Sequence, residues 1–358
     1  MIRSRVKKLV VKVSLQIIPF LLLVGCLTPI TIETDKVGGS IVISGQVSSL
    51  NDRNIVQIGT ASQDARLPFP LSGAMVQLFD GMGNDFYYSE SLPGIYKLEN
   101  FSGVPGVPYS LRVTLPDGTI YESDPEKMPE AVGTINTSFV VANEAYIDGE
   151  GTPSNQDFIS IYHSSNLIEL PAKSYLRWSV EETFIISPTD YPDISGSIPP
   201  PCFITETIDP QRIVLFDKTI SSGTSIQNQF LGRRIIDYSF LEKHYFSSYQ
   251  TALTANAYEY WRKINILANQ VGSIFDTPPA RIEGNIKNIK NYSEEVLGYF
   301  QAVNENVDRI VIFPSMLEVP LEFQKCDFTG NFNPLDYPTR CYDCLRVRNS
   351  TYDRPVWF

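Results

Sequence analysis

Short runs of alternating apolar and polar residues dominate the first third of the chain. In Ile41–Val47 and Tyr109–Leu115 the apolar side chains fall largely on every second position, as in a strand with one buried face. Further short strands are expected at Ala74–Phe79, Phe86–Tyr88, Ile95–Leu98 and Thr119–Tyr121. Strands of this length, with a turn about every 8–12 residues, predict a small antiparallel β-sandwich over residues 40–125.

The order of these strands and turns resembles that of immunoglobulin-like and prealbumin-like modules, in particular the carboxypeptidase regulatory-like module. Pro116-Asp117-Gly118 is one of the turns, since proline presets φ and glycine accepts a positive φ. The resemblance implies a binding or spacing module and supplies no catalytic residues.

A polar, proline-containing segment at residues 122–130 predicts a domain boundary. Strand patterns resume near Ile135 and continue to residue 313. The strands expected there are Thr137–Val141, Phe158–Tyr162, Tyr175–Ile185, Ile213–Phe216, Ile235–Leu241, Tyr245–Ala252, Arg281–Ile286, Val296–Val303 and Arg309–Phe313. We therefore expect a second β-rich, sandwich-like domain over residues 135–313.

One segment of this second region has helical periodicity. Apolar residues recur about every 3.6 positions over residues 254–271. Thr254 suits the N-cap and Gly272 the position after the last turn. Tyr260 and Trp261 have the spacing of core residues, with a ligand platform as the alternative. The predicted fold class is all-β, with two sandwich-like regions, one inserted amphipathic helix and an irregular tail over residues 314–358.

The chain begins with the features of a bacterial lipoprotein signal. Residues 1–12 carry five basic side chains and no acidic one, and residues 13–25 are nearly all apolar but too few to span a bilayer. Leu23-Val24-Gly25-Cys26 then resembles a lipobox, in which the cysteine is acylated and cleavage falls before it. We expect residues 1–25 to be a signal peptide, Cys26 to be the lipidated residue, and residues 26–39 to be a tether. A buried N-terminal helix with a chance cysteine is the alternative.

The charge balance argues against some partners. The net charge is −11, and removal of the five basic residues of the signal leaves 24 basic against 40 acidic residues, or −16. A surface this acidic disfavours nucleic acid and anionic lipid headgroups. Leu27 follows the lipidation site where an inner-membrane retention signal would have an aspartate. We therefore expect lipid anchoring at the outer membrane, with the cell surface favoured over the periplasmic leaflet.

Four cysteines remain outside the lipobox: Cys202, Cys326, Cys341 and Cys344. In an exported chain they indicate disulfide bonds. We expect Cys202 and Cys326 each to bond one of the two cysteines of the CxxC pair, which would attach the C-terminal tail to the body. A four-cysteine zinc site and a redox pair are the alternatives.

Few residues indicate catalysis. The chain has two histidines, His163 and His244, and lacks the common nucleophile, zinc-protease and nucleotide-binding motifs. Adjacent Glu181 and Glu182 would point to opposite faces of a strand, so they cannot flank one glycosidic bond. A hydrolase with a site scattered over loops is ranked last among the possible functions, and no cofactor is expected.

Two sets of residues are weak candidates for ligand binding. Asp148, Glu150 and Asp157 supply oxygen atoms that could hold calcium, although their spacing does not match an EF-hand and a polar turn is preferred. Aromatic residues that could grip a glycan or a peptide are Tyr87, Tyr88, Tyr191 and Phe203, and packing on strand faces is their alternative role.

Three separated segments carry a resemblance to a known family. They are the strands and turns of the first sandwich, the stretch Tyr258-Glu259-Tyr260-Trp261 with Gly272–Asp276 and Arg281–Ile286, and the tail with Cys341-Tyr342-Asp343-Cys344. Together they resemble a family of Bacteroidota lipoproteins known only as a domain of unknown function, number 4249. The tail departs from the family pattern, because Leu345 follows Cys344 and the chain ends in Val356-Trp357-Phe358.

The resemblance implies an accessory lipoprotein, a lid or docking subunit, of a TonB-dependent transporter or a related outer-membrane machine. It implies no catalytic residues. A stand-alone surface protein that binds a glycan, a peptide or a metal chelate is the alternative.

Overall fold

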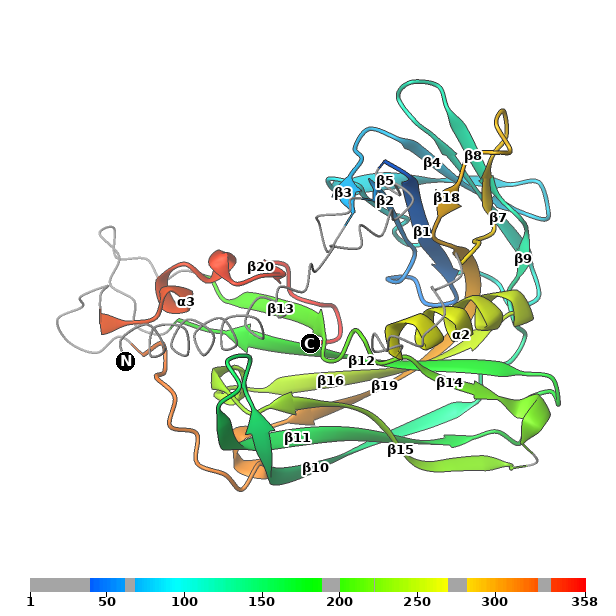
Figure 1. Ribbon diagram of the computed structural model, residues 1–358. Coiled ribbons are helices and arrows are strands. Elements are labelled where there is room, and N and C mark those ends of the chain that lie inside the picture. Colours follow the sequence, from blue (N-terminus) through cyan, green and yellow to red (C-terminus); the bar gives the residue numbers. More distant parts are fainter. Residues whose placement is uncertain (1–38, 62–67, 189–199, 222, 270–281, 328–335) are drawn as a thin grey trace, which may run out of the picture. The chain divides into compact units, whose positions relative to one another are not determined.

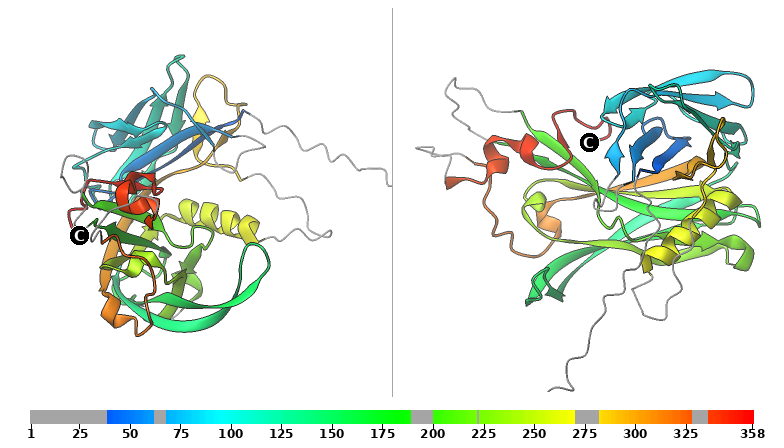
Figure 2. Two further views of the ribbon diagram at one scale, coloured as in Figure 1. Left: turned by 90° about the vertical axis from the view of Figure 1, so that its left-hand side faces the viewer. Right: turned by 45° about the horizontal axis from the view of Figure 1, so that its top comes forward.

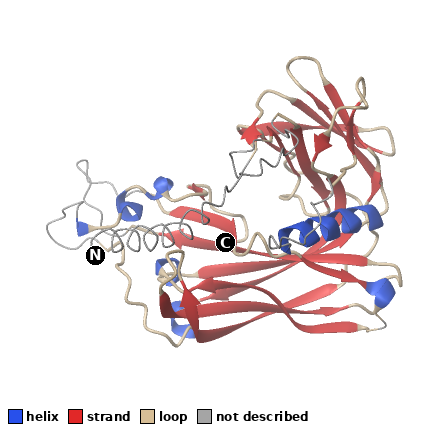
Figure 3. Ribbon diagram, in the orientation of Figure 1, coloured by secondary structure: helices blue, strands red, loops and turns tan. Residues whose placement is uncertain are grey.

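The computed structural model describes residues 39–61, 68–188, 200–221, 223–269, 282–327 and 336–358. Cys26 and the expected signal peptide lie outside the described residues. Gly38–Phe358 forms one compact unit. This unit is built mainly from strands (Figures 1 and 3), and the predicted all-β sandwich class is confirmed. Within the described part of the chain, no helix has the length and apolar character needed to cross a membrane.

Two sheets form the first sandwich. One contains β1 (Ile41–Ser48), β2 (Ile55–Thr60), β3 (Phe69–Pro70) and β6 (Ile95–Lys97). The other contains β4 (Met75–Asp80), β7 (Pro108–Thr114), β8 (Ile120–Ser123) and β9 (Glu126–Lys127). β5 (Asp85–Leu92) pairs with β4 in its first half and with β6 in its second, so it links the two sheets.

The alternation seen in the sequence decides which face of each strand is buried. On β1, Ile41, Ile43 and Val47 enter the sandwich core, and on β7 so do Leu111 and Val113. The intervening side chains of β1 point away from this core. The outer face of the β1 sheet carries polar residues such as Ser44 and Gln46 besides the apolar Val42.

Strands from late in the chain complete the first sandwich. β17 (Ile286–Asn288) pairs with β8, while β18 (Val296–Leu297) and the start of β19 (Phe300–Ile312) pair in parallel with β1. Phe300 and Ala302 are buried in the same core as Ile43. The predicted module of residues 40–125 thus takes in strands from residues 286–303, because parallel partners of β1 can come from any distance along the chain.

Two glycines make this late addition possible. Gly298, between β18 and β19, has φ of +98°, and a Cβ on it would lie 2.1 Å from the carbonyl oxygen of Ile43. A Cβ on Gly284 would lie 1.8 Å from the carbonyl oxygen of Gly298. Next to Gly284, the Asn285 side chain accepts a hydrogen bond from the Phe300 N–H at 2.9 Å and donates one to the Phe300 carbonyl at 2.8 Å. These contacts fix where β19 begins.

Two further sheets form the second sandwich. One contains β12 (Tyr175–Ile186), β13 (Cys202–Thr207), β14 (Val214–Asp217), β16 (His244–Leu253), the later part of β19, and β20 (Ser350–Thr351). The other contains β10 (Thr134–Ile147), β11 (Pro153–Asn166) and β15 (Ser225–Ile235). Its core includes Ile159 and Ile161 of β11, Trp178 and Val180 of β12, and Phe246 of β16.

β19 belongs to both sandwiches. Its first residues, Phe300–Val303, pair with Gly45–Ser48 of β1. The following residues, Asn304–Ile312, pair with His244–Ala252 of β16. Figure 2 shows this strand in orange, running from one part of the fold into the other. A single unbroken strand therefore connects the two sheets that carry the cleft described below.

The predicted helix is α2 (Ala255–Asn269), and its expected last residues, 270 and 271, lie outside the described residues, as does Gly272 after them. Thr254 caps it: its Oγ1 accepts a hydrogen bond from the Ala257 N–H at 3.1 Å. The predicted strand at Ile235–Leu241 is wrong beyond its first residue. There the chain forms a 3₁₀ turn, η2 (Tyr238–Phe240), because the Asp237 side chain accepts from the Ser239 N–H and caps it. Two further 3₁₀ turns of the described residues are η1 (Lys218–Ile220) and η3 (Pro314–Met316), and η3 begins the tail.

The tail is held by disulfide bonds, as the sequence favoured. Cys202 bonds Cys344, and Cys326 bonds Cys341. The first bond attaches the tail to β13, whereas the second closes a loop within the tail. Short elements follow one another here: α3 (Thr339–Tyr342), η5 (Cys344–Arg346) and then β20, which pairs with β13.

Candidate functional site

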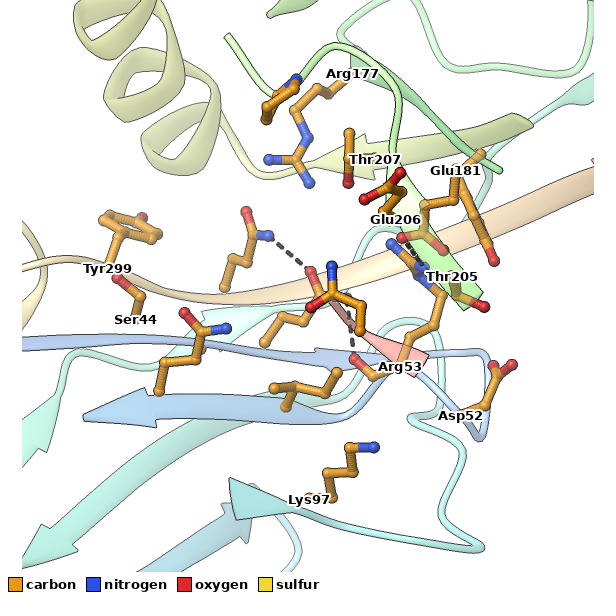
Figure 4. A pocket seen from close by; sticks show the side chains of 18 of the residues that line it. Ser44, Asp52, Arg53, Lys97, Arg177, Glu181, Thr205, Glu206, Thr207 and Tyr299 are labelled. Atoms are coloured by element: carbon orange, nitrogen blue, oxygen red, sulfur yellow. Dashed lines mark hydrogen bonds and ion pairs between the residues drawn. The ribbon is translucent and has the colours of Figure 1, made fainter. Parts of the chain in front are cut away.

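A polar cleft of about 990 Å³ lies between the outer face of the β1 sheet and the outer face of the β12 sheet. Figure 4 shows the side chains that enter it. Its lining from the first sandwich includes Ser44, Gln46, Asp52, Arg53, Ile55, Gln57 and Lys97. Its lining from the second sandwich includes Arg177, Glu181, Thr205, Glu206, Thr207 and Tyr249. Tyr260, Trp261, Tyr299, Gln301, Arg348, Asn349, Pro355 and Trp357 add further walls.

The strand period explains how these residues come to face one another. On β12, Leu176, Trp178 and Val180 point into the second core. Arg177 and Glu181 alternate with them and therefore point into the cleft. The cleft is thus lined by the non-core faces of two sheets, which explains why so many of its residues are polar.

Arg53 is the best-anchored cation of the cleft. Its Nη1 lies 3.0 Å from Glu181 Oε1, its Nε lies 3.1 Å from Glu305 Oε2, and its guanidinium lies 3.7 Å from the centre of the Tyr249 ring. Burial alone would lower the pKa of Arg53, but the carboxylates of Glu305 and Glu181 outweigh this effect and raise it. Arg53 is therefore a fixed structural charge at one end of the cleft.

Glu305 on β19 joins the two sandwiches at this end. Its fully buried carboxylate accepts hydrogen bonds from Ser48 Oγ at 2.6 Å and from Thr251 Oγ1 at 2.8 Å, besides the Arg53 contact. Ser48 belongs to β1 and Thr251 to β16. Removing one partner of such a buried charge leaves the charge unpaired, which is costly. The network therefore holds the floor of the cleft rigid.

Arg177 differs from Arg53 because no carboxylate of the described residues pairs with it. Its guanidinium lies 4.1 Å from the centre of the Trp261 ring, and its Nε is buried without a hydrogen-bond partner in the described part of the chain. Burial lowers the pKa of Arg177 to about 10, with nearby Arg53 acting in the same direction and Glu305 opposing it. The side chain thus remains charged at neutral pH and points into the cleft (Figure 4).

The helix wall of the cleft is a set of ordered aromatic rings. Tyr260 stacks on Tyr299 with ring centres 4.8 Å apart. Trp261 Nε1 donates to Gln301 Oε1 at 2.9 Å, and Gln301 Nε2 donates to Gln46 Oε1 at 3.0 Å. Tyr260 and Trp261 are half-buried and line the cleft, so they combine packing with the platform position that the sequence left as the alternative.

The tail supplies another wall. Arg348 and Trp357 line the cleft, and Phe358 is buried against Phe203 of β13 and Tyr245 of β16. The disulfide between Cys202 and Cys344 and the pairing of β20 with β13 hold this segment in place. The last residues of the chain thus help to shape the site.

The two histidines do not belong to the cleft lining. His163 is fully buried, and neither ring nitrogen has a hydrogen-bond partner among the described residues. Burial lowers the pKa of His163 to about 4. His244 Nε2 lies 2.9 Å from Glu182 Oε2, and its ring stacks on Phe240. Both are core residues.

The adjacent glutamates Glu181 and Glu182 separate as expected for a strand. Glu181 pairs with Arg53 in the cleft, while Glu182 meets Arg234 Nε at 2.8 Å on the other face. Burial alone would raise the pKa of Glu182, but His244 and Arg234 hold it below its usual range. The two carboxylates therefore cannot act together on one substrate.

The weak calcium candidates do not converge. Asp148 Oδ1 accepts from the Glu150 N–H at 3.0 Å and the Thr152 N–H at 2.8 Å, which makes it the polar turn between β10 and β11. Asp157 on β11 accepts from Asn143 at 2.7 Å. In the described ranges, no group of three or more His, Cys, Asp or Glu side chains could hold a metal ion.

The aromatic candidates lie outside the cleft lining. Tyr87 is exposed on β5, whereas Tyr88 and Phe203 are buried in packing. Tyr191 lies outside the described residues. The cleft residues that sequence reasoning missed are Arg53, Arg177 and Arg348. One signal could have indicated Arg177: it stands between Leu176 and Trp178 in a strand that is otherwise apolar at its start.

Fold and site define an all-β protein of two sandwiches with a polar, arginine-containing cleft between them. The model of one family, a domain of unknown function (DUF4249), matches residues 27–309 of the chain. This is most of the chain, and the protein belongs to this family. The matched range ends within β19, so the tail lies beyond it. No curated protein and no solved structure matches the chain.

Proposed function

We propose that this protein is a non-enzymatic, lipid-anchored outer-membrane protein that acts as an accessory subunit, a lid or docking partner, of a TonB-dependent transporter. The observation that carries a binding role is the cleft. It combines fixed charges, hydrogen-bonding side chains and aromatic walls in one cavity of ligand size.

The chemistry of the cleft favours binding over catalysis. Its best-placed carboxylate, Glu181, is neutralised by Arg53. Neither histidine of the chain is among its lining residues. A hydrolytic site would need a nucleophile or acid within hydrogen-bond reach of a base. The described lining residues offer no such pair. A binding role accounts for the rigid network of Glu305, Arg53, Ser48 and Thr251 beneath them.

The membrane part of the proposal rests on the N-terminal sequence. The basic segment, the apolar run and Cys26 follow one another as in a lipoprotein signal. The proposal is tested by fusing a purification tag to the C-terminal side of the chain and extracting the membranes gently. Recovery of a transporter barrel in equal amount supports the accessory role, and recovery of the protein alone contradicts it. A Cys26→Ala variant is the matched control, because it should lose the lipid and the partner together.

A stand-alone binding protein is the second candidate. The observation that favours it is that the cleft is of ligand size and is lined by hydrogen-bonding side chains and aromatic rings. Such a protein would bind its glycan, peptide or metal chelate with the same affinity when purified alone. An accessory subunit, in contrast, would bind its cargo more tightly in the presence of its barrel.

A further inference from the structure

One cation in the cleft, the half-buried Arg177, has no counter-ion in contact with it among the described residues. Arg53 forms ion pairs with both Glu181 and Glu305. No carboxylate of the described residues is left in contact with Arg177, and its Nε has no acceptor. Buried polar groups in folded proteins nearly always have a partner, and charged ones require it most. The position beside the Arg177 guanidinium is therefore open to a hydrogen-bond acceptor of a bound ligand.

The guanidinium of Arg177 is held ready for such an acceptor. It lies over the Trp261 ring, and that ring is fixed by its hydrogen bond to Gln301, which in turn donates to Gln46. A side chain held in place by a ring loses little further freedom when it binds. Arg177 also comes from a central strand, since Leu215 of β14 and Thr251 of β16 flank it.

None of the acidic lining residues Asp52, Glu181 and Glu206 forms an ion pair with Arg177 among the described residues. Glu181 is bound to Arg53 at 3.0 Å. Burial and the neighbouring carboxylate of Glu182 raise the pKa of Glu206, whereas Arg234 and Arg348 act in the opposite direction. Lys97 and Arg348, at the exposed rim of the same cleft, form no ion pair among the described residues and add positive charge. The cleft thus admits an anion although the chain as a whole carries a net charge of −11.

We propose that the cleft binds a polar oligomer that carries carboxylate groups, one of which pairs with Arg177. This inference rests on the binding function proposed above. A single half-buried charge without a counter-ion in contact matches a monoanionic carboxylate better than a doubly charged phosphate. The size of the cleft, about 990 Å³, fits several linked units. Ser44, Gln57, Thr205 and Thr207 would meet the uncharged polar groups, and Lys97 and Arg348 further carboxylates.

The shared chemistry could come from sugar acids or from acidic peptides, and two pairs of probes distinguish them. The first pair is trigalacturonate and its neutral methyl ester. The second is triglutamate and triglutamine. Calorimetric titration of the full-length, detergent-solubilised protein is expected to show binding of at least one acidic probe. Its neutral counterpart is expected to bind at least about tenfold more weakly, since a hydrogen bond to a charged group accounts for such a ratio.

The variant Arg177→Met tests the residue itself. Affinity for the acidic probe is expected to fall about 10- to 100-fold, while the neutral probe is unaffected. Arg212→Met is the matched control. Arg212 also lies over a ring, 4.4 Å from the centre of Phe230, but it is exposed and lies outside the cleft lining. This variant should bind like the wild type.

A second variant keeps the test decisive if Arg177→Met does not fold. Arg348→Gln, at the exposed rim, is expected to lower the affinity for the acidic probe a few-fold at low salt. The inference is overturned if no acidic probe binds, if inorganic phosphate displaces the acidic probe at lower concentration than acetate does, or if Arg177→Met binds like the wild type. Co-purification of a barrel would leave the proposed function standing in each of these cases.

Discussion

At the scale of single residues, the junction between β18 and β19 depends on two glycines, because neither position has room for a Cβ. Gly298 and Gly284 let three backbones approach one another, those of β1, β18 and the segment before β17. Any Cβ at Gly298 would meet the carbonyl oxygen of Ile43 in β1. Gly284 belongs to the segment Arg281–Ile286 that carries part of the family resemblance, and the close approaches give both positions a physical reason for being glycine.

Replacing Gly298 should therefore be far more damaging than replacing a glycine in an open turn. Gly298→Ala is expected to lower the free energy of unfolding by about 3 kcal/mol or more, because backbone strain and a backbone clash add together. Gly118→Ala is the control: its φ is +83°, but a Cβ there would meet nothing within 4 Å. This control should cost about 1 kcal/mol. Urea denaturation measures the free energy of unfolding of both variants. Equal losses of stability would contradict a role for the close approach of Gly298 to the Ile43 carbonyl oxygen.

His163 makes stability depend on pH. Its ring packs 4.6 Å from the Trp178 ring, and burial lowers its pKa from about 6.5 to about 4. Between these two values the unfolded chain binds a proton that the folded chain does not. Stability should therefore fall as the pH drops from 6.5 to 4, and this contribution should be constant above and below that window.

The variant His163→Phe removes the titrating group and keeps a ring against Trp178. The wild type is expected to lose about 3 kcal/mol more than the variant between pH 7 and pH 4. Urea unfolding at several pH values measures the free energy of unfolding of both proteins. The contributions of carboxylates that titrate in both cancel when the two free energies are subtracted. Parallel stability curves for the two proteins would rule out His163 as the cause.

Single residues were predicted from the sequence where their surroundings are local. Thr254 was identified as a helix cap, and the separation of Glu181 from Glu182 followed from the strand period. Arg53 and Arg177 were missed, because in a sequence a charged residue in a turn or on a strand is expected to face solvent. Only the approach of a second sheet turns that exposed face into a cleft.

At the scale of elements, one long-range covalent bond links the tail to the body, in addition to the pairing of β20 with β13. The Cys202–Cys344 bond spans 142 residues, whereas Cys326–Cys341 spans 15. In the chain-entropy model a cross-link stabilises more when it closes a longer loop. The two bonds should therefore differ in their contribution although they lie in the same tail.

Removing the bonds one at a time tests this difference. The double variant Cys202→Ala/Cys344→Ala is expected to lose about 2 kcal/mol more than Cys326→Ala/Cys341→Ala. Protease digestion provides a second measurement, because the first variant should release the segment around Trp357 and the second should not. Equal sensitivity of the two variants would contradict the distinction drawn between the bonds.

The boundaries of elements show why local patterns are limited. The cores of β10, β11, β12 and β16 were found, but β10 and β11 run on to 14 residues each. Their ends, such as Ala145–Ile147 paired with Pro153–Asn155, are polar or exposed and lack a strong pattern. Pairing along the hairpin, rather than burial, keeps them extended.

At the scale of the whole molecule, the sequence predicted two successive domains, and the strands are instead shared between two sandwiches. The pattern around Val296–Val303 was identified as strand, but its partner was not. Parallel pairing with β1 bridges about 255 residues, from Gly45 to Phe300. Alternation reveals that a strand has a buried face and says nothing about which strand lies beside it.

A fragment of residues 39–130 should therefore not fold by itself. It lacks β17, β18 and the start of β19, and with them Phe300 and Ala302 of its core. An NMR spectrum of this fragment is expected to have the narrow dispersion of an unfolded chain. A fragment with residues 283–306 joined through a flexible linker serves as control and should recover dispersed signals. A folded short fragment would show that the late strands are dispensable.

The shared strand β19 also means that β1 is synthesised long before its parallel partner. Chains grow from the N-terminus at about 5–20 residues per second, so β1 is made on the order of 10–50 s before the residues that will lie beside it. During that interval β1 lacks its parallel partners and part of its core, and such an unpaired strand can pair with a strand from a neighbouring chain. The nascent protein becomes safe from such exchange only when Phe300–Val303 arrive.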